Sequence, residues 1–429
     1  MTTADSMSRI DDPIWHLTGP ILVARDRIES EAWVVNGRIT YRKPEQELHG
    51  RDPVDLDGFV LPGLADLHCH IGIGDAGGVV SLEEARAQAI TDRDTGVLLI
   101  RDAGSLLDTR SLQDRGGQGA GLPRIVRCGR HIARTRRYLI GYADEVEPDA
   151  LADTCARELQ RSDGWVKVVA DWIDRDLGDL APTFEADDFA AAAARVHAAG
   201  GHITAHTFAE DTLPMLLDAG FDCLEHASGL NDDTIDRVAA ARVPVVTTLV
   251  NVGEFTTYAA QGERKFPAYA AHMRALHAAR YERTAAAHEA GIQLLLGTDS
   301  GGVLGHGIVH DEMAELKKVG LSDVDVLQAA CWGPAQFLGA DTGTAERKVQ
   351  PDREVQDHGE QPDWGINTAG CSVQPGSDAA ARWNAEPFGL GEGAIADLLV
   401  MDQDPRSDVR ALKDLSAVLI GGRRVSPGS

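Results

Sequence analysis

Residues 202–249 read HITAHTFAEDTLPMLLDAGFDCLEHASGLNDDTIDRVAAARVPVVTTL, and this stretch decides the fold. It repeats one unit, in which a short run rich in Val, Ile and Leu is followed by a turn and then by an amphipathic, Ala-rich segment. Glycines such as Gly220 and Gly291 follow several of these segments, as is typical of helix C-termini. Short apolar runs that alternate with helices indicate parallel strands buried on both faces.

The same unit recurs on both sides of this stretch, so that the chain contains eight apolar runs. The expected strands are Phe59–Leu67, Val97–Arg101, Arg124–Cys128, Trp165–Val169, His202–His206, Cys223–His226, Pro244–Leu249 and Gln293–Gly297. The expected helices between them include Leu82–Thr95, Asp149–Arg161, Ala186–Ala199, Asp211–Ala219, Asp232–Ala241 and Ala268–Ala290. Eight alternating units predict an α/β fold, the (β/α)8 TIM barrel, over residues 61–341. A doubly wound open sheet is the alternative, and the count of eight disfavours it.

The two terminal segments show strand-like alternation instead. One runs from about Trp15 to Leu56, with turns at Asn36-Gly37 and Asp57-Gly58, and the other covers Ala396–Val425. We expect residues 1–60 and 387–429 to pair into a small β-sandwich domain. Residues 342–386 are rich in Gly, Pro, Gln, Asp and Glu without a clear period. They are predicted to be an inserted loop or disordered segment, with an active-site lid as the alternative.

Composition excludes several classes of protein. The formal net charge of −26 argues against nucleic acid or an anionic membrane as a partner, and leaves a small-molecule substrate. Met1–Pro13 lacks the basic start and apolar core of a signal peptide, and no apolar run approaches 18 residues. The six cysteines form no CxxC pair, as expected of reduced thiols. We therefore expect a cytoplasmic protein, and association into a homo-oligomer stays open.

The first chemical motif is Asp66-Leu67-His68-Cys69-His70, at the end of an expected strand. Residues i and i+2 of a strand point to the same side, so His68 and His70 can reach one metal ion. Imidazole is a common ligand of zinc and of its neighbours. Taken alone, the pair leaves open whether it is a ligand pair or a coincidence.

Four more polar residues stand where the strands of a barrel would end. His206 and His226 each end a run, Asp299 follows the eighth, and Lys167 lies inside Trp165–Val169, where a buried charge is costly. Each has a structural alternative, because a strand-end histidine can be a satisfied polar residue and a lysine can pair with an acid. All six candidates nevertheless fall at the face where TIM-barrel active sites lie, which predicts a metal site.

The stretch Leu61-Pro62-Gly63-Leu64-Ala65-Asp66-Leu67-His68-Cys69-His70 resembles the opening motif of the amidohydrolase superfamily. The ordered set His-x-His, Lys, His, His and Asp is similar to that of its binuclear members. The resemblance implies two divalent ions, by default Zn²⁺, with Mn²⁺ or Co²⁺ as alternatives. It assigns the ligands as follows: His68, His70 and Asp299 to the more buried ion, His206 and His226 to the more exposed ion, and Lys167, as its carbamate, to both.

The likeness extends along most of the chain, toward the imidazolonepropionase-like and prolidase-like branch. It is carried by Arg101-Asp102-Ala103-Gly104, Glu225-His226, Gly297-Thr298-Asp299, His306-Gly307 followed by Glu312, and the closing run Gly393–Val400. Two loops depart from the branch. Prolidase-like relatives often carry Gly-Gly-His after the third strand, where this chain has Arg136-Arg137-Tyr138, and Gly-Gly after the lysine, where it has Trp172-Ile173.

These loops supply the candidate substrate contacts. Arg136 and Arg137 are expected to grip a carboxylate, and Tyr138 to donate a hydrogen bond to the developing oxyanion or to the substrate. His306 is expected to contact the substrate or to shape the eighth loop. A solvated surface loop is the alternative for the arginines. The substrate that fits these residues is an amide bearing a carboxylate, such as a dipeptide or an N-acyl amino acid.

The predicted reaction is hydrolysis of a C–N bond. A hydroxide that bridges the two ions would attack the carbonyl, and the catalytic Asp299 would carry the proton to the leaving nitrogen. A lactonase, a phosphotriesterase-like enzyme or a cyclic-amide hydrolase would use the same ligands and is an alternative. A mononuclear deaminase of the same superfamily would lack the lysine and would use a glutamate near the third histidine. Here Glu210 lies four residues after His206, and Glu225 is expected to alternate away from His226. A non-catalytic scaffold would lack ligands, whereas all six are present.

Overall fold

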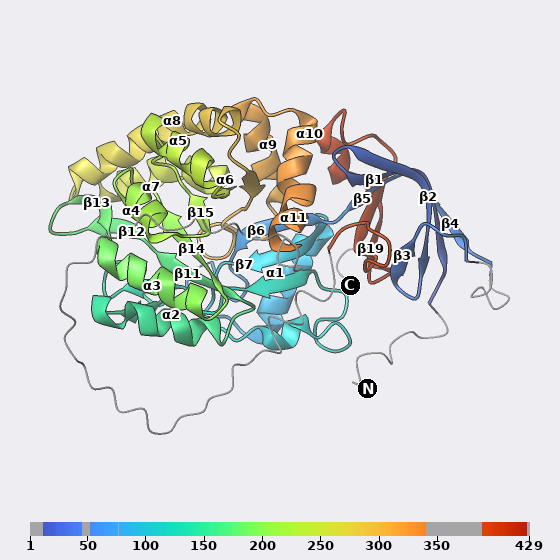
Figure 1. Ribbon diagram of the computed structural model, residues 1–429, viewed down its shortest axis with the longest axis horizontal. Helices are drawn as coiled ribbons and strands as arrows, with labels where there is room; N and C mark the ends of the chain where they lie inside the picture. Colours follow the sequence, from blue (N-terminus) through green and yellow to red (C-terminus); the bar gives the residue numbers. More distant parts are fainter. Residues whose placement is uncertain (1–11, 45–51, 76, 340–387, 427–429) are drawn as a thin grey trace, which may run out of the picture.

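The computed structural model describes residues 12–44, 52–75, 77–339 and 388–426. Its strands form two assemblies: an eight-stranded sheet from the terminal segments, and a core with a seven-stranded, a three-stranded and a two-stranded sheet (Figure 1). The predicted insertion at 342–386, together with its alternative as a lid, lies outside the described residues.

The terminal segments pair into one sheet with the strand order β20-β19-β18-β5-β1-β2-β3, and β4 pairs with β1. Its strands are β1 (Trp15–Ala24), β2 (Arg27–Val35), β3 (Arg38–Thr40), β4 (Val54–Asp57), β5 (Phe59–Pro62), β18 (Leu398–Met401), β19 (Leu415–Ile420) and β20 (Arg423–Arg424). The predicted turn Asn36-Gly37 joins β2 to β3, with φ of 51° and 75°. The two ends of the chain do pair, but they form a single sheet in the described residues, so the sandwich and the domain bounds stay predictions.

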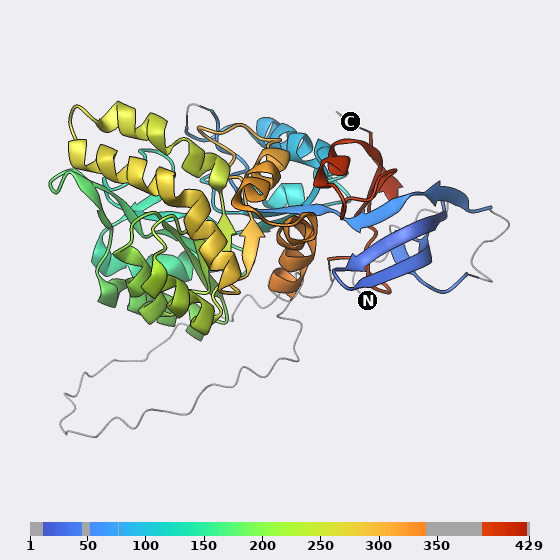
Figure 2. The same ribbon diagram turned by 90° about the horizontal axis from the view of Figure 1, so that it is seen from above.

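This terminal sheet lies at one end of the molecule, beside the part that carries the helices. Figures 1 and 2 show the blue strands from the N-terminus and the red strands from the C-terminus side by side. The antiparallel pairing of β5 with β18, in which Val60 stands opposite Val400, joins the two ends of the chain.

The expected strand Phe59–Leu67 is in fact two strands that meet at Gly63. β5 belongs to the terminal sheet, while β6 (Leu64–Cys69) pairs with β7 in the other assembly. A Cβ atom at Gly63 would lie 2.3 Å from Cβ of Leu98, so the chain changes sheets where only a glycine fits. The apolar run hid this change, because residues buried in either sheet look alike in sequence.

Most core strands follow the predicted runs, whereas the two between Ile132 and Val146 were not predicted. The core strands are β6, β7 (Val97–Asp102), β8 (Arg124–Arg127), β9 (Ile132–Arg134), β10 (Asp144–Val146), β11 (Trp165–Val169), β14 (His202–Thr207), β15 (Cys223–His226), β16 (Val245–Thr247) and β17 (Leu294–Leu296). A hairpin of β12 (Asp171–Asp174) and β13 (Asp179–Pro182) follows β11.

Helices lie between the strands, as expected of an α/β fold. They are α1 (Leu82–Asp94), α2 (Leu151–Leu159), α3 (Ala186–Ala198), α4 (Thr212–Ala219), α5 (Asp232–Ala241), α6 (Leu249–Gly253), α7 (Phe255–Gly262), α8 (Pro267–Glu289), α9 (Val309–Val319), α10 (Asp323–Leu327) and α11 (Gly333–Gly339). The predicted glycine Gly220 ends α4 in the left-handed conformation. Within the described chain, no helix combines the length and apolar character needed to cross a membrane.

The α/β class is confirmed, and part of the strand order is the one that a closed barrel requires. Parallel pairing runs in chain order from β11 through β14, β15 and β16 to β17, without the reversal of a doubly wound sheet. Beyond β17, Asp299 N donates to His68 O at 2.6 Å and His70 N to Ser300 O at 2.7 Å, which ties this sheet to β6. The ladders nevertheless divide into a three-stranded and a seven-stranded sheet, so the closed eight-stranded barrel stays a prediction.

A buried carboxylate fastens the terminal sheet to the core. Asp397, just before β18, accepts two hydrogen bonds from the Arg115 guanidinium, at 2.9 and 2.7 Å, and one from Gly421 N at 2.8 Å. Arg124 at the start of β8 lies 3.5 Å away. The carboxylate therefore links the closing strands to the loops around β8.

We expect the substitution Asp397→Ala to lower the free energy of unfolding by about 3 kcal/mol, because it removes one partner of a buried ion pair. Urea unfolding followed by circular dichroism measures the change. Asp402→Ala, at an exposed position, is the control and should stay within about 0.5 kcal/mol of the parent. Equal unfolding midpoints for the two variants would refute this role of Asp397.

Candidate metal centre

Five of the predicted ligands stand at or just after the carboxyl ends of core strands, and the sixth, Lys167, lies in the middle of its strand. The six are His68 in β6, His70 directly after it, Lys167 in β11, His206 in β14, His226 at the end of β15, and Asp299 after β17. Parallel strands present their carboxyl ends at one edge, where α/β enzymes place their sites. Contacts among the six side chains bring them together there.

Three of them form a tight group. His68, His70 and Asp299 each offer a ligand atom, and these atoms lie within 4.8 Å of one another. Asp299 Oδ1 is 3.0 Å from His68 Nε2 and 3.2 Å from His70 Nε2. His70 Nδ1 donates to the carbonyl of Gly104 at 2.7 Å, which leaves Nε2 as its ligand atom. Burial alone would raise the pKa of Asp299, but the neighbouring imidazoles hold it well below its usual range, so the group offers an anion and two imidazoles.

The other two histidines carry buried nitrogen atoms without a partner. The rings of His206 and His226 are 4.7 Å apart, and Nε2 of each has no hydrogen-bond partner among the described residues. Asp171 Oδ1 lies 3.9 Å from His206 Nε2, beyond hydrogen-bonding distance. Burial lowers the pKa of both imidazoles well below the usual value. Both rings are therefore neutral and can bind a metal ion through a nitrogen lone pair. Bare, buried imidazole nitrogens fit a divalent ion.

Lys167 lies beside these histidines in the interior. Alternation along β11 turns Val166 and Val168 into the main apolar cluster and leaves Lys167 on the opposite face, with its side chain 3% exposed. Its Nζ is 3.1 Å from Glu225 Oε2 and 3.4 Å from His68 Nε2. Lys167 thus pairs with an acid, which was the structural alternative drawn from the sequence. Its carbamate stays a prediction.

Glu225 is a residue whose part in the centre the sequence did not reveal. Strand alternation suggested that it would turn away from His226, yet its carboxylate lies directly against other predicted ligands. Oε2 contacts both Lys167 Nζ and His68 Nδ1, and Oε1 accepts a hydrogen bond from Arg101 at 2.9 Å. The sequence signal was its position one residue before a strand-end histidine, but a single strand does not show what lies across the interior.

Two of the predicted ligands have unusual backbone conformations. His226 has a φ of 64° and Asp299 a φ of 57°, and Ala227 after the first has a φ of 49°. Residues other than glycine occupy this left-handed region rarely, and such strain gathers at functional sites. The conformation takes His226 out of the regular alternation at the end of β15, while Asp299 lies three residues beyond β17.

His131 is a further histidine at the centre that sequence reasoning missed. It follows β8 by four residues, and its ring lies 5.4 Å from that of His70. Nδ1 donates to the Gly104 carbonyl at 3.1 Å, while its buried Nε2 has no partner in the described part of the chain. The same strand-end rule could have found it, because His131 stands just beyond the run Arg124–Cys128.

The loop that carries the predicted substrate contacts divides into two parts. The Tyr138 ring faces the centre, 6.0 Å from His206, and packs at 4.7 Å against Trp172 of the β12–β13 hairpin. Arg137 is engaged by Asp174 at 2.9 Å and by two backbone carbonyls at 3.3 Å, so a substrate carboxylate would have to displace Asp174. Arg136 is exposed. The structure thus brings Tyr138, and not the two arginines, to the ligands.

His306 belongs to a separate polar network behind the eighth strand. Its Nδ1 lies 2.8 Å from Asp92 in α1 and 3.4 Å from Ser300. Burial lowers its pKa, but Asp92 outweighs this effect and the pKa is raised. These contacts fit the expectation that His306 shapes the eighth loop.

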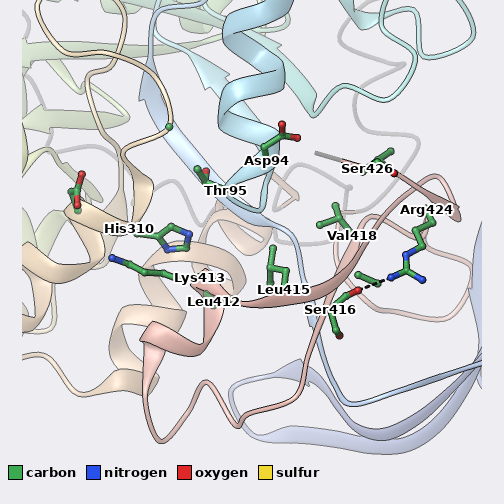
Figure 3. A pocket seen from close by; sticks show the side chains of 14 residues that line it. Asp94, Thr95, His310, Leu412, Lys413, Leu415, Ser416, Val418, Arg424 and Ser426 are labelled. Atoms are coloured by element: carbon green, nitrogen blue, oxygen red, sulfur yellow. Dashed lines mark hydrogen bonds between the residues drawn. The ribbon is translucent and has the colours of Figure 1, made fainter. Parts of the chain in front are cut away.

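The cavity of about 550 Å³ in Figure 3 is not part of this centre. It lies between the end of α1, the start of α9 and the C-terminal strands, with His310, Lys413 and Arg424 on its walls. None of the six predicted ligands is among the residues that line it.

A family model and mycobacterial relatives match this chain. Residues 177–352 match the model of the amidohydrolase family. Uncharacterized proteins of Mycobacterium tuberculosis strain H37Rv and of Mycobacterium bovis are each 41% identical over 403 residues, which cover 94% of both chains.

Solved structures share the fold. A Xaa-Pro dipeptidase with bound methionine has a TM-score of 0.71 at 17% identity, covering 96% of this chain and 99% of that one. The ochratoxinase of A. niger has a TM-score of 0.69 at 15% identity, covering 97% and 96%. A prolidase complexed with N-methylphosphonate-L-proline has a TM-score of 0.69 at 17% identity, covering 96% and 100%. The chain therefore belongs to the amidohydrolase family, and it is a hydrolytic enzyme that acts on carbon–nitrogen bonds.

Proposed function

We propose that this hydrolase holds two divalent metal ions, by default Zn²⁺, and cleaves an amide or peptide-like bond of a small molecule. The assignment of ligands is the one that the resemblance implies: His68, His70 and Asp299 to one ion, His206 and His226 to the other, and the carbamate of Lys167 to both. One observation carries the proposal. The bare Nε2 atoms of His206 and His226 lie buried beside a group that already combines two imidazoles and a carboxylate.

Carbamylation would suit the surroundings of Lys167. The ammonium first loses a proton, and the neutral amine then adds to carbon dioxide, forming an N–C bond and releasing a second proton, so that a buried cation becomes an anion. The carbamate keeps one N–H group, which can still donate to Glu225 Oε2, now 3.1 Å from Nζ. An anion at this position would balance divalent charge, which a lysine ammonium would oppose.

When bound, the two ions supply Lewis acidity that lowers the pKa of a water molecule and polarises the scissile carbonyl. The remaining steps fall to the chain. The carboxylate of Asp299, whose Oδ1 faces the ligand nitrogens of His68 and His70, takes the proton from the attacking water. The same carboxyl group then passes this proton to the leaving nitrogen, and the amine departs neutral.

The expected substrate is a dipeptide or an N-acyl amino acid. The Tyr138 hydroxyl is the candidate to donate to the oxyanion, and burial raises its pKa, so it stays protonated at neutral pH. Tyr138, Trp172 and Phe208 surround the ring of His206, with centroids 4.2 to 6.0 Å away. An apolar or aromatic group of the substrate would pack well against this wall.

The names of the structural neighbours support an amide-type bond. They include a Xaa-Pro dipeptidase, a prolidase, an ochratoxinase, a molinate hydrolase and a phenylurea hydrolase. Because these neighbours share 15% to 17% of their residues with this chain, they favour the bond type and leave the substrate to experiment.

The first test is to load the protein with Zn²⁺ in bicarbonate buffer and to measure amine release from a library of dipeptides and N-acyl amino acids. We expect two ions per chain and a turnover that vanishes when a chelator removes them. Two bound ions without turnover would keep the centre but reject this substrate class, and lactones, phosphoesters and cyclic imides would then be screened. A protein that binds no divalent ion would refute the proposal.

We expect Asp299→Asn to lower kcat by at least about 100-fold, because an amide cannot accept and return the proton. The fold should be kept, as the thermal unfolding midpoint of the metal-free protein will show. Asp233→Asn, an exposed change of the same kind on α5, is the matched control. An Asp299→Asn variant with parental kcat would contradict the role of the carboxylate in proton transfer.

A further inference from the structure

The short helix α6 contributes no predicted ligand, yet the residues of its first turns contact ligands of both ions. Thr248, its N-terminal cap, places Oγ1 2.6 Å from His226 Nδ1. Asn251 donates from Nδ2 to Asp299 Oδ2 at 2.5 Å. Thr248 is 1% and Asn251 5% exposed, so both contacts are made away from bulk water. Buried hydrogen bonds of this kind fix the orientation of a ligand and the nitrogen or oxygen it offers.

The two ligands that α6 contacts are the ones with left-handed backbone conformations. His226 and Asp299 have φ of 64° and 57°, a region that residues other than glycine occupy only at an energetic cost. Such conformations persist only where surrounding contacts hold them. With Nδ1 of His226 donating to Thr248, its Nε2 is left free for a metal, and with Oδ2 of Asp299 held by Asn251, Oδ1 faces His68 and His70.

A buried acid holds α6 itself in place. Glu312 in α9 accepts hydrogen bonds from the backbone nitrogen atoms of Leu249 at 2.9 Å and of Val250 at 2.8 Å. These are two of the N–H groups that the first turn of a helix leaves without a partner. From the other side, the Tyr258 hydroxyl donates to Asn251 Oδ1 at 3.0 Å, which directs the amide nitrogen toward Asp299.

We propose that α6, held by Glu312, is a positioning element that sets His226 and Asp299 together, with Thr248 acting on the first and Asn251 on the second. The inference rests on the proposed function, because the two residues are positioned for metal ions. Thr248, Asn251, Tyr258 and Glu312 are positioning residues in this scheme, since none of them is a ligand.

The test is a titration of the metal-free protein with Co²⁺ in bicarbonate buffer, followed by visible absorption, which reports two binding constants without any substrate. We expect Thr248→Val to weaken one of them about 10-fold to 100-fold, and Asn251→Leu to weaken the other by a similar factor. Glu312→Gln should weaken both, because an amide nitrogen cannot accept a hydrogen bond from the backbone.

Two further variants separate positioning from packing. Thr248→Ser keeps the hydroxyl and loses the methyl group, so it should bind Co²⁺ like the parent, whereas a packing role predicts that serine fails and valine succeeds. Thr257→Val makes the same change at an exposed position of α7 and should alter neither constant. If Asn251→Leu gives no cooperative thermal transition, Tyr258→Phe replaces it, and should weaken the same constant by a smaller factor.

Parental binding constants in the Thr248 and Asn251 variants would overturn the proposal and leave the metal centre intact. Weakening of the same single constant by both variants would also overturn it, because each residue is assigned to a different ion. Failure of the parent protein to bind Co²⁺ would instead remove the proposed function, and this inference with it.

Discussion

The centre depends on the negative charge of Glu225, which is buried beside Arg101, Lys167 and His68. Its Oε1 accepts hydrogen bonds from Arg101 at 2.9 Å and from Thr204 at 2.6 Å, and its Oε2 contacts Lys167 and His68. Burial opposes the charged form, but His68, Lys167 and Arg101 hold the pKa of Glu225 well below its usual range. Removing one partner of a buried ion pair costs several kcal/mol, so this carboxylate ties five strands, β6, β7, β11, β14 and β15, around one point. The convergence of the predicted ligands follows from that constraint.

Around this charge, the strands supply the ligands and the segments after them supply the orientation. The strands place the candidate ligands near their carboxyl ends, and the backbones of His226 and Asp299 depart from the extended conformation there. Their left-handed backbones set the direction of the side chains, and the hydrogen bonds from Thr248 and Asn251 hold it. A centre of this kind is built from two layers, because a side chain at a strand end has rotational freedom that only a second contact removes.

Family membership and substrate choice depend on different parts of this structure. The family is read from the motifs and from the match of residues 177–352 to the model of the amidohydrolase family. The substrate depends on loops, and here the hairpin β12–β13 brings Trp172 beside Tyr138 while its Asp174 engages Arg137. One fold with the same metal ligands can serve different amides, because the walls above the ligands belong to segments that the strand framework does not constrain.

The sequence by itself determined the α/β class, the eight core runs, the turn at Asn36-Gly37 and the six ligand positions that the structure brings together, because strand and turn patterns are local. It did not determine where one apolar run divides between two sheets at Gly63, since burial in either sheet selects the same residues. It also missed Glu225, His131 and Asn251 as parts of the centre, and it placed two arginines where only Tyr138 reaches the ligands. Those facts are long-range: contacts between strands and loops far apart in the chain exist only once the tertiary structure has formed, and no local pattern records them.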